Sequence, residues 1–424
     1  MVEKIFRHFL QVRKVSTDTR SIPTDSIFFA LKGDKFNGNA FAKQALEAGA
    51  SMSVVDEDVQ SDDQRIVRVD DVLTALQQIS GMYRDTFSIP FLGITGSNGK
   101  TTTKELIRDV LSKKYRVSAT KGNLNNHIGV PLTLLSIPAD CEFAIIEMGA
   151  NHKKEIASYC EYAKPDFGLI TNIGKAHLEG FGGEEGVLLG KKELYDYVIA
   201  HNGKIFVNTE LDKLRIASDR MNRIEYGFHT GGLSLECISE SPSVTYTSTF
   251  NGSTQQFETK LAGSYNLYNI ASAVVVGRYF DVDEKSIHDA ICEYTPENNR
   301  SQLKNTERNT LIMDAYNANP SSLEYALIGL SKQSVANKFF VIGDMLELGE
   351  SGPAEHRHIL DVATSLGLSG ITVGPIFHQV KSGFPSFINN TEAKEYLSGL
   401  GIHDSIILVK GSRGIRLEEL VDVL

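Results

Sequence analysis

The stretch GITGSNGKTTTKEL, Gly93 to Leu106, decides the fold because it joins an apolar run to a helix-like segment through a glycine-rich turn. Glycine can take positive φ, which lets main-chain amides converge on a phosphate, and a helix N-terminus adds a positive dipole end. Lys100 is placed to reach the β- and γ-phosphates, and the Thr101 hydroxyl to ligate Mg²⁺. The residues predicted to bind a nucleotide here are Gly96, Ser97, Asn98, Gly99, Lys100, Thr101 and Thr102.

The composition is that of a globular protein with more than one domain. The chain has 424 residues, of which 41% are apolar and 23% charged, and about 150 residues per domain suggests three domains. A net charge of −10 argues against general nucleic-acid binding, which needs a basic stripe. No apolar run reaches the roughly 18 residues of a membrane span, and the N-terminus does not resemble a signal peptide. The four cysteines are far apart, which argues against a disulfide framework and favours a cytoplasmic location.

Short apolar runs alternate with amphipathic segments along the chain. Such runs are typical of strands buried on both faces, and the alternation predicts an α/β protein with parallel sheets. The predicted strands are SIFFAL, FLGITG, FAIIEMG, FGLITNIG, TLIMDA, FFVIGD, GITVG and SIILVKG, and TTKELIRDVLSKKY is a predicted helix. SPSVTYTSTFNGSTQQFETK predicts a hairpin that turns at Asn251-Gly252.

Two stretches suggest domain boundaries: the first lies between a helix-like segment and the strand of the glycine loop, and the second is polar and turn-rich. One is RDTFSIPFLG, and the other is YTPENNRSQLKNTERN. They divide the chain into residues 1–86, 87–304 and 305–424.

Four further residues lie at a strand end, in a loop or on a helix-like segment. Glu147 ends the strand in AIIEMGANHKKEI, where a carboxylate can face a metal–nucleotide complex or simply cap the next helix. His177 lies in the loop of LITNIGKAHLEGFG, and a lone histidine in a loop is more often structural than a ligand. Lys191 and Lys192 in GKKELYDY would, on local sequence alone, be solvated helix residues.

Taken together, these motifs resemble those of the Mur ligases, ATP-dependent peptide ligases of cytoplasmic peptidoglycan synthesis. The family loop is TGxxGKT, so Ile94 in place of the first P-loop glycine is expected, and TNIGxAHLExFG covers the whole histidine loop. The resemblance implies a three-domain Mur ligase architecture, with a central P-loop parallel-sheet ATPase domain and a Rossmann-like C-terminal domain. It implies ATP and Mg²⁺ as cofactors.

The resemblance also implies roles for single residues. Lys100, His177 and Lys191 would be catalytic, with Lys191 carbamylated by CO₂ as in several family members. Asn266 in AGSYNLYNIASAVVVG would lie near the adenine, Arg300 in ENNRSQ would meet the phosphates, and Asp314 would contact the ribose. The implied metal ligands are Thr101, Glu147, His177 and Lys191.

The stretches DAYNANPSS, GDMLELGE, VKGSRGIRLE and KGNLNNHIGVPLTLL are similar to the forms found in the member that adds D-alanyl-D-alanine to UDP-N-acetylmuramoyl-tripeptide. STDTRSIPTDSIFFALKGDKFNGNAFAKQALEAGA resembles the domain that holds the UDP end, with contacts expected from the 32–39 loop. A departure is Lys121, where the family has proline in TPGN. The residues expected to contact substrate are Thr19, Arg20, Asn125, Asn126, Asn317 and Asn319.

Other activities remain open at this point. A folylpolyglutamate synthetase, or the ligase that adds the third amino acid, would share the loop, although DAYNANP and GDMLELGE argue against both. A regulatory or transport P-loop NTPase would bind nucleotide without forming a peptide bond. We expect a monomer in which the C-terminal domain closes on the central one, because an activated carboxyl group must be kept from water.

Overall fold

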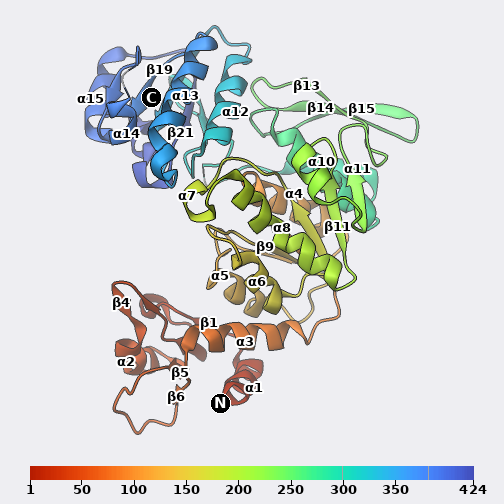
Figure 1. The fold of residues 1–424 in the computed structure, drawn as a ribbon, viewed down its shortest axis with the longest axis vertical. Coiled ribbons are helices and arrows are strands. Elements are labelled where there is room, and N and C mark those ends of the chain that lie inside the picture. Colours follow the sequence, from red (N-terminus) through yellow and green to blue (C-terminus); the bar gives the residue numbers. More distant parts are fainter. Residues whose placement is uncertain (298, 381) are drawn as a thin grey trace.

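The computed structural model describes residues 1–297, 299–380 and 382–424. Three α/β units follow one another along the molecule, from the N-terminal unit through a central unit to the C-terminal unit (Figure 1). Each unit contains its own sheet of mainly parallel strands, as the alternation of apolar runs predicts. Among the described residues, no helix combines the length and the apolar character needed to cross a membrane.

The N-terminal unit has a four-stranded parallel sheet in the order β1-β2-β5-β6, with a separate small hairpin, β3-β4. Its strands are β1 Val15–Ser16, β2 Ser26–Phe29, β3 Lys32–Gly33, β4 Phe36–Asn37, β5 Ala50–Val55 and β6 Ile66–Arg68. Its helices are α1 Val2–Val12, η1 Thr19–Ser21, η2 Gly38–Phe41, α2 Ala42–Glu47 and α3 Val72–Arg84. Tyr83 on α3 and Phe9 on α1 share one apolar core with the central unit, so this unit is packed against its neighbour.

The central unit has a six-stranded parallel sheet in the order β12-β11-β10-β7-β9-β8. Its strands are β7 Phe91–Thr95, β8 Val117–Ala119, β9 Phe143–Glu147, β10 Phe167–Ile170, β11 Lys204–Asn208 and β12 Arg223–Tyr226. Its helices are α4 Lys100–Ser112, α5 Gly129–Leu135, α6 Glu155–Ala163, α7 Leu178–Phe181, α8 Glu184–Ala200, α9 Asp212–Ala217, α10 Asn266–Tyr279 and α11 Glu284–Glu293. Helices pack on both faces, which explains why the strands read as continuous apolar runs.

A three-stranded antiparallel sheet of β13 Leu235–Ser239, β14 Thr245–Phe250 and β15 Ser253–Glu258 lies to one side of the central unit (Figure 1). The predicted hairpin is confirmed: Phe250 pairs with Ser253 across the turn. Asn251 and Gly252 both have positive φ, at 51° and 75°, as a two-residue hairpin turn of this kind requires.

The C-terminal unit has six strands in the order β16-β17-β21-β18-β19-β20, of which only β16 runs antiparallel to its neighbour. Its strands are β16 Gln302–Asn305, β17 Asn309–Met313, β18 Asn337–Gly343, β19 Ser369–Val373, β20 Ser386–Phe387 and β21 Ser405–Lys410. Its helices are α12 Pro320–Ser331, η3 Gly349–Ser351, α13 Gly352–Ser365, α14 Pro375–Gln379, α15 Asn390–Leu400, η4 Arg413–Ile415 and η5 Leu417–Val423. The division at residues 86 and 304 stays a prediction, and β16 spans residue 304 while pairing in this third sheet.

Strand register brings the predicted site residues to one edge of the central sheet. Ile94 is level with Glu147 across β7 and β9, and Thr95 is level with Ile170 across β7 and β10. The loops that follow these three adjacent parallel strands therefore begin at the same edge, where α/β sheets usually bind ligands.

Candidate active site

The glycine loop between β7 and α4 is closely packed. Gly96 has φ +145°, and a Cβ there would lie 1.9 Å from Oγ1 of Thr171. Gly99 has φ +77° and caps α4, and a Cβ there would lie 2.5 Å from Oδ1 of Asn269. Both glycines are thus required by backbone conformation and by the nearness of the next loop.

The main-chain amides of this loop divide into two groups. Those of Ser97 and Asn98 donate to the main-chain oxygen and to Oδ1 of Asn172, both at 3.0 Å. Within the described residues, the amides of residues 99–102, at the cap and first turn of α4, donate to no main-chain oxygen. Free amides at a helix N-terminus are an anion site, so the start of α4 is where the loop can receive a phosphate.

Lys100 extends back over the loop. Its Nζ donates to the main-chain oxygens of Gly96 at 2.7 Å and Ser97 at 3.3 Å. Burial of the ammonium lowers the pKa of Lys100, with a smaller contribution in the same direction from Arg300, while the Glu147 charge opposes both. An anion would therefore be attracted by two cations that belong to different parts of the chain.

Thr101 and Glu147, both predicted metal ligands, are in contact. The Thr101 hydroxyl lies 3.1 and 3.0 Å from the two carboxylate oxygens, and Asn125 Nδ2 donates to Oε1 at 2.7 Å. Only 1% of Glu147 is exposed. The oxygens of a hydroxyl and a carboxylate suit Mg²⁺, so the donor set fits the predicted ion. Asn125, predicted to contact substrate, reaches this carboxylate.

Lys104 supplies a buried positive charge behind Glu147. Its Nζ lies 3.8 Å from Glu147 Oε2 and 3.6 Å from Glu105 Oε1, and it donates to the main-chain oxygen of Thr120 at 2.7 Å. The Thr120 hydroxyl accepts from the Glu147 main-chain amide at 2.9 Å. Lys104 was not predicted from the sequence, although its position one turn after Lys100 on a helix was a signal for it.

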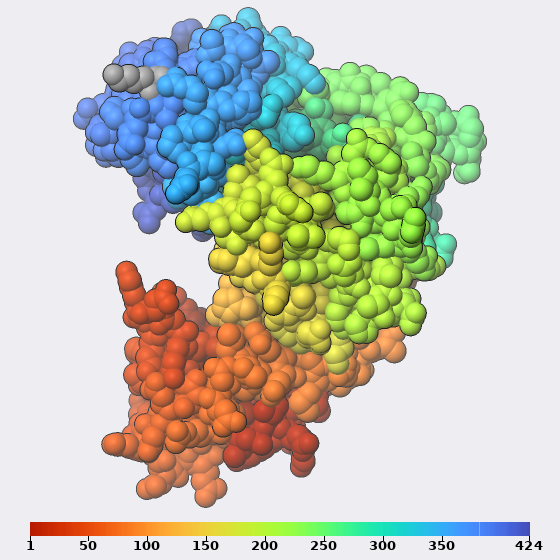
Figure 2. Space-filling view, viewed as in Figure 1, coloured from red at the N-terminus to blue at the C-terminus, as the bar shows by residue number. Residues whose placement is uncertain are grey.

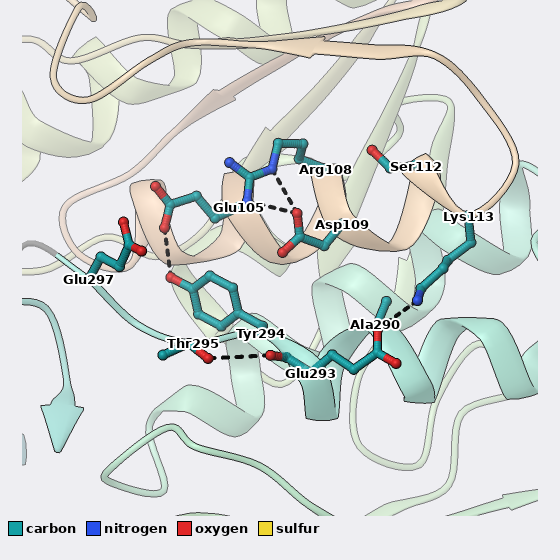
Figure 3. A pocket seen from close by; sticks show the side chains of 10 residues that line it. All are labelled: Glu105, Arg108, Asp109, Ser112, Lys113, Ala290, Glu293, Tyr294, Thr295 and Glu297. Atoms are coloured by element: carbon teal, nitrogen blue, oxygen red, sulfur yellow. Dashed lines mark hydrogen bonds and ion pairs between the residues drawn. The ribbon is translucent and has the colours of Figure 1, made fainter.

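A cavity of about 530 Å³ lies between α4 and α11, away from the glycine loop (Figure 3). Its charges are largely satisfied within the protein: Arg108 pairs with Asp109, Lys113 with Glu293, and Tyr294 donates to Glu105 at 2.6 Å. The lining residues are Glu105, Arg108, Asp109, Ser112, Lys113, Ala290, Glu293, Tyr294, Thr295 and Glu297. None of the predicted site residues is among them, so this cavity is separate from the glycine loop.

Lys191 on α8 is almost fully buried, with 1% exposed. Its Nζ donates to the Ala150 main-chain oxygen at 3.2 Å and lies 5.1 Å from the centre of the Phe181 ring. Burial, and then the charge of Lys100, hold the pKa of Lys191 well below its usual range. By contrast Lys192 forms an ion pair with Asp196 on the surface, so of the two lysines Lys191 is the one inside the protein.

His177 faces the C-terminal unit. Its Nδ1 lies 2.5 Å from Oε2 of Glu347, without the angles of a hydrogen bond. The nearness of the His177 ring lowers the pKa of Glu347. Within residues 1–297, 299–380 and 382–424, no three His, Cys, Asp or Glu side chains gather as a metal-binding group. The predicted role of His177 in binding a second Mg²⁺ stays a prediction.

Asn266 and Asn269 lie inside the protein, between α10 and α4. Asn266 donates to the Ala262 main-chain oxygen at 2.7 Å and accepts from Asn269 at 2.8 Å, and Asn269 accepts from the Thr103 hydroxyl at 2.9 Å. Asn266 is fully buried. The structure thus places Asn269 against the glycine loop, with Asn266 behind it, and contact of Asn266 with adenine stays a prediction.

Arg300 and Asp314 lie where the central and C-terminal units meet. The Arg300 guanidinium is 3.7 Å from the centre of the Tyr316 ring, and that of Arg413 is 5.4 Å from it. Asp314 accepts from Lys410 Nζ at 2.6 Å and from the Ser301 amide at 3.2 Å. The motif that contains Arg300 includes residue 298, which is outside the described residues.

The C-terminal unit contacts the glycine loop directly. Asn319 Nδ2 donates to Asn98 Oδ1 at 2.7 Å, and Asn98 Nδ2 donates to Asn319 Oδ1 at 3.4 Å. Lys175 Nζ donates to Glu355 at 2.7 Å, and the Lys175 amide donates to the Ser321 hydroxyl at 3.1 Å. These contacts join the units at the carboxyl edge of the central sheet.

The residues predicted to bind the UDP end lie apart from the glycine loop. Arg20, next to Thr19, is mostly exposed and forms a two-point ion pair with Asp18. Asn126 accepts from the amides of residues 128 and 129 and so shapes its own loop. Figure 2 shows a cleft between the N-terminal and C-terminal units, and the β3-β4 hairpin lies at its rim.

The remaining site residues missed from the sequence are Asn172, Tyr316, Glu347 and Lys410. Glu347 and Tyr316 lie within the quoted stretches GDMLELGE and DAYNANPSS, but His177 and Arg413, which they contact, are far away in the sequence. Only the fold brings these pairs together.

Comparison with known proteins defines the class. The chain matches the Mur ligase family catalytic domain over residues 11–84, the Mur ligase middle domain over 94–277 and the Mur ligase glutamate ligase domain over 299–413. It belongs to the Mur ligase family. The predicted α/β fold with three Mur ligase domains is confirmed.

Several relatives carry the same more specific name. The UDP-N-acetylmuramoyl-tripeptide–D-alanyl-D-alanine ligase of Bacillus subtilis is 34% identical over 97% of this chain and 92% of its own length. That of Escherichia coli is 30% identical over 97% and 93%. Among solved structures, MurF from Thermotoga maritima in complex with ADP has a TM-score of 0.86 at 26% identity, covering 98% of this chain and 97% of that one. MurF from Acinetobacter baumannii has a TM-score of 0.87 at 28% identity, covering 97% and 93%.

Proposed function

We propose that this protein joins D-alanyl-D-alanine to UDP-N-acetylmuramoyl-tripeptide at the expense of ATP, in the peptidoglycan synthesis of the cytoplasm. The observation that carries the proposal is full-length similarity to ligases of that name, at 34% identity for the Bacillus subtilis protein. The DAYNANPSS stretch, from Asp314 to Ser322, supports the choice of this family member. We further propose that it acts as a monomer.

The reaction overcomes the poor electrophilicity of a carboxylate. The terminal carboxylate of the tripeptide attacks the γ-phosphate of ATP, which gives an acyl phosphate and ADP. The amine of D-alanyl-D-alanine then attacks the acyl carbon and displaces phosphate, which forms the peptide bond. An α-amino group has a pKa of roughly 8, so a useful neutral fraction exists near neutral pH without a dedicated base.

The nucleotide loop would neutralise charge during phosphoryl transfer. The free amides at the start of α4 would bind the phosphates, Lys100 lies over the same loop, and Arg300 adds a second cation nearby. Such positioned charges are the main means by which enzymes accelerate phosphoryl transfer. Asn266 and Asp314 are the proposed contacts for adenine and ribose.

Thr101 and Glu147 would hold Mg²⁺, with His177 and carbamylated Lys191 as further ligands. When bound, Mg²⁺ supplies positive charge to the phosphate oxygens. The depressed pKa of Lys191 supports carbamylation, because only a neutral amine can attack CO₂. Lys104 would keep the buried Glu147 carboxylate in place.

The two other substrates would bind on either side of the nucleotide. The N-terminal unit would hold the UDP end through Thr19, Arg20 and the 32–39 hairpin, with the 125–126 loop nearer the sheet edge. Asn317, which is exposed, is a proposed contact for the dipeptide. Asn319 is a second, although its amide group already bonds within the protein.

The test is phosphate release with purified protein, ATP and Mg²⁺. A ligase should release phosphate only when D-alanyl-D-alanine and a muramoyl-tripeptide are both present, and mass spectrometry should find the pentapeptide. Parallel reactions with the diaminopimelate and the lysine tripeptide identify the preferred acceptor. Phosphate release that ignores the dipeptide would instead indicate a switch NTPase and overturn the proposal.

A further inference from the structure

One contact between the units is made by two amide side chains and involves the nucleotide loop itself. Asn98 lies in the loop, and Asn319 is the residue before α12. Their amides exchange hydrogen bonds at 2.7 and 3.4 Å, although the residues are 221 positions apart in the chain. A primary amide can donate and accept at once, so each of these two side chains satisfies the other.

The position of Asn98 is fixed by the glycine loop's own supports. Its amide donates to Asn172 Oδ1 at 3.0 Å, and its main-chain oxygen accepts from Thr171 Oγ1 at 2.6 Å and Asn172 Nδ2 at 2.9 Å. Since every main-chain polar group of Asn98 is already bonded to the 171–172 segment, its side chain is held pointing out of the loop. Any change in the loop's path would therefore move that side chain.

The position of Asn319 is fixed by helix α12. Asn319 Oδ1 accepts from the Ser322 main-chain amide at 2.9 Å, and the Ser322 hydroxyl accepts from the Asn319 main-chain amide at 3.1 Å. The two residues thus form a capping box. Ser321, in the same first turn, accepts from the Lys175 amide at 3.1 Å. The first turn of α12 is thus docked on two loops at the carboxyl edge of the central sheet.

We propose that Asn98 and Asn319 are positioning residues that couple the shape of the nucleotide loop to the placement of the C-terminal unit, and through it to the binding of D-alanyl-D-alanine. The pair links the loop that receives phosphate to the segment 314–319, which precedes α12. Lys410 bonds to that segment at two places, the Asp314 carboxylate and the main-chain oxygen of Asn317. The effect on the dipeptide rests on the proposed function, whereas the docking itself does not.

The test uses full-length protein with Asn98→Ala, Asn319→Ser and the double substitution. Serine keeps a helix cap at position 319 but is too short to reach Asn98, so loss of the pair is separated from loss of the cap. Asn337→Ala is the matched control, because Asn337 is an exposed residue of the same unit and its side-chain amide donates to the main-chain oxygen of residue 404, not to another unit. The measurements are the KM for D-alanyl-D-alanine, the Kd for Mg-ADP by calorimetry, and the radius of gyration with Mg-ADP by X-ray scattering.

We expect each single substitution to raise the KM for the dipeptide about tenfold, as for the loss of one or two neutral hydrogen bonds. The double variant should be no worse than either single variant, because the two side chains act as one unit. In each of the two single variants, the Kd for Mg-ADP should change less than about threefold. The radius of gyration of each should be larger than that of the wild type. The control should match the wild type in all three measurements.

Two results would overturn the inference. One is a weaker Kd for Mg-ADP in Asn98→Ala with an unchanged KM for the dipeptide, which would make Asn98 a simple nucleotide contact. The other is independent, multiplying effects in the double variant. Should the wild type form no pentapeptide, the proposed function fails, while the scattering comparison still decides whether the pair docks the two units.

Discussion

The packing of Gly96 permits a quantitative test of the nucleotide loop. In Gly96→Ala, the new methyl group would lie 1.9 Å from Thr171 Oγ1, far inside van der Waals contact, at a φ of +145°. The threonine side chain cannot swing away freely because its hydroxyl donates to Asn98 at 2.6 Å. An unfavourable backbone region costs about 1–3 kcal/mol, and overpacking costs about another 1–3 kcal/mol.

The loop can relieve this strain only by moving, so we expect that cost of at least about 2 kcal/mol to appear as lost nucleotide affinity, about 30-fold or more. The assay is calorimetric titration with Mg-ADP, with the melting temperature recorded alongside. Gly401→Ala is the control, because Gly401 has φ +58° and no atom within 4 Å of the added methyl group, so its cost is limited to stability. Thr171→Ala in the Gly96→Ala background should recover part of the affinity. Binding of Mg-ADP by Gly96→Ala within about threefold of wild type would refute the reasoning.

Three further substitutions test the site and the packing of the C-terminal unit. Lys100→Met should lower the rate of ligation by about 100-fold or more while the melting temperature stays close to wild type, and an unchanged rate would remove Lys100 from the mechanism. Lys104→Met should lower the free energy of unfolding by about 3–5 kcal/mol, because it leaves a buried carboxylate unpaired, and adding Glu147→Gln should recover part of this loss in urea titrations. His356 is buried and neutral, since Nδ1 contacts the Gly352 oxygen and Nε2 accepts from the Met345 amide, and burial lowers its pKa. The unfolded chain therefore binds one more proton than the folded chain below about pH 6.5. The free energy of unfolding should fall as the pH drops from there, by up to about 1.4 kcal/mol per pH unit. In His356→Gln this part of the pH dependence should disappear, and a pH dependence equal to that of the wild type would contradict a neutral His356.

In the parallel sheets, the strands that the sequence predicts are those with continuous apolar character. The eight quoted runs correspond to β2, β7, β9, β10, β17, β18, β19 and β21, and TTKELIRDVLSKKY lies in and just after α4. Strands such as β1, β16 and β20 have only two to four residues and no apolar run. Their pairing is decided by the neighbouring strand, which local sequence does not reveal.

The candidate site was predictable where residues near in sequence work together. Gly96, Gly99, Lys100 and Thr101 form one turn, so their geometry follows from the motif. The hydrogen-bond partners were not predictable in this way, because Asn98 meets Asn319 and His177 meets Glu347 only through the packing of one unit on another. Burial was hidden as well: nothing in GKKELYDY shows which lysine faces inward until α8 is packed.

Three residues that contact the glycine loop or the start of α4 lie early in the chain. Thr171, Asn172 and Asn269 all precede the third sheet, which begins with β16 at Gln302. Because domains generally fold in turn as the ribosome releases them, the nascent chain already contains these three partners of the loop before Asn319 has been synthesised. The C-terminal unit, which is synthesised last, therefore packs against a central unit that has already folded. The order of synthesis thus matches the order in which the units assemble.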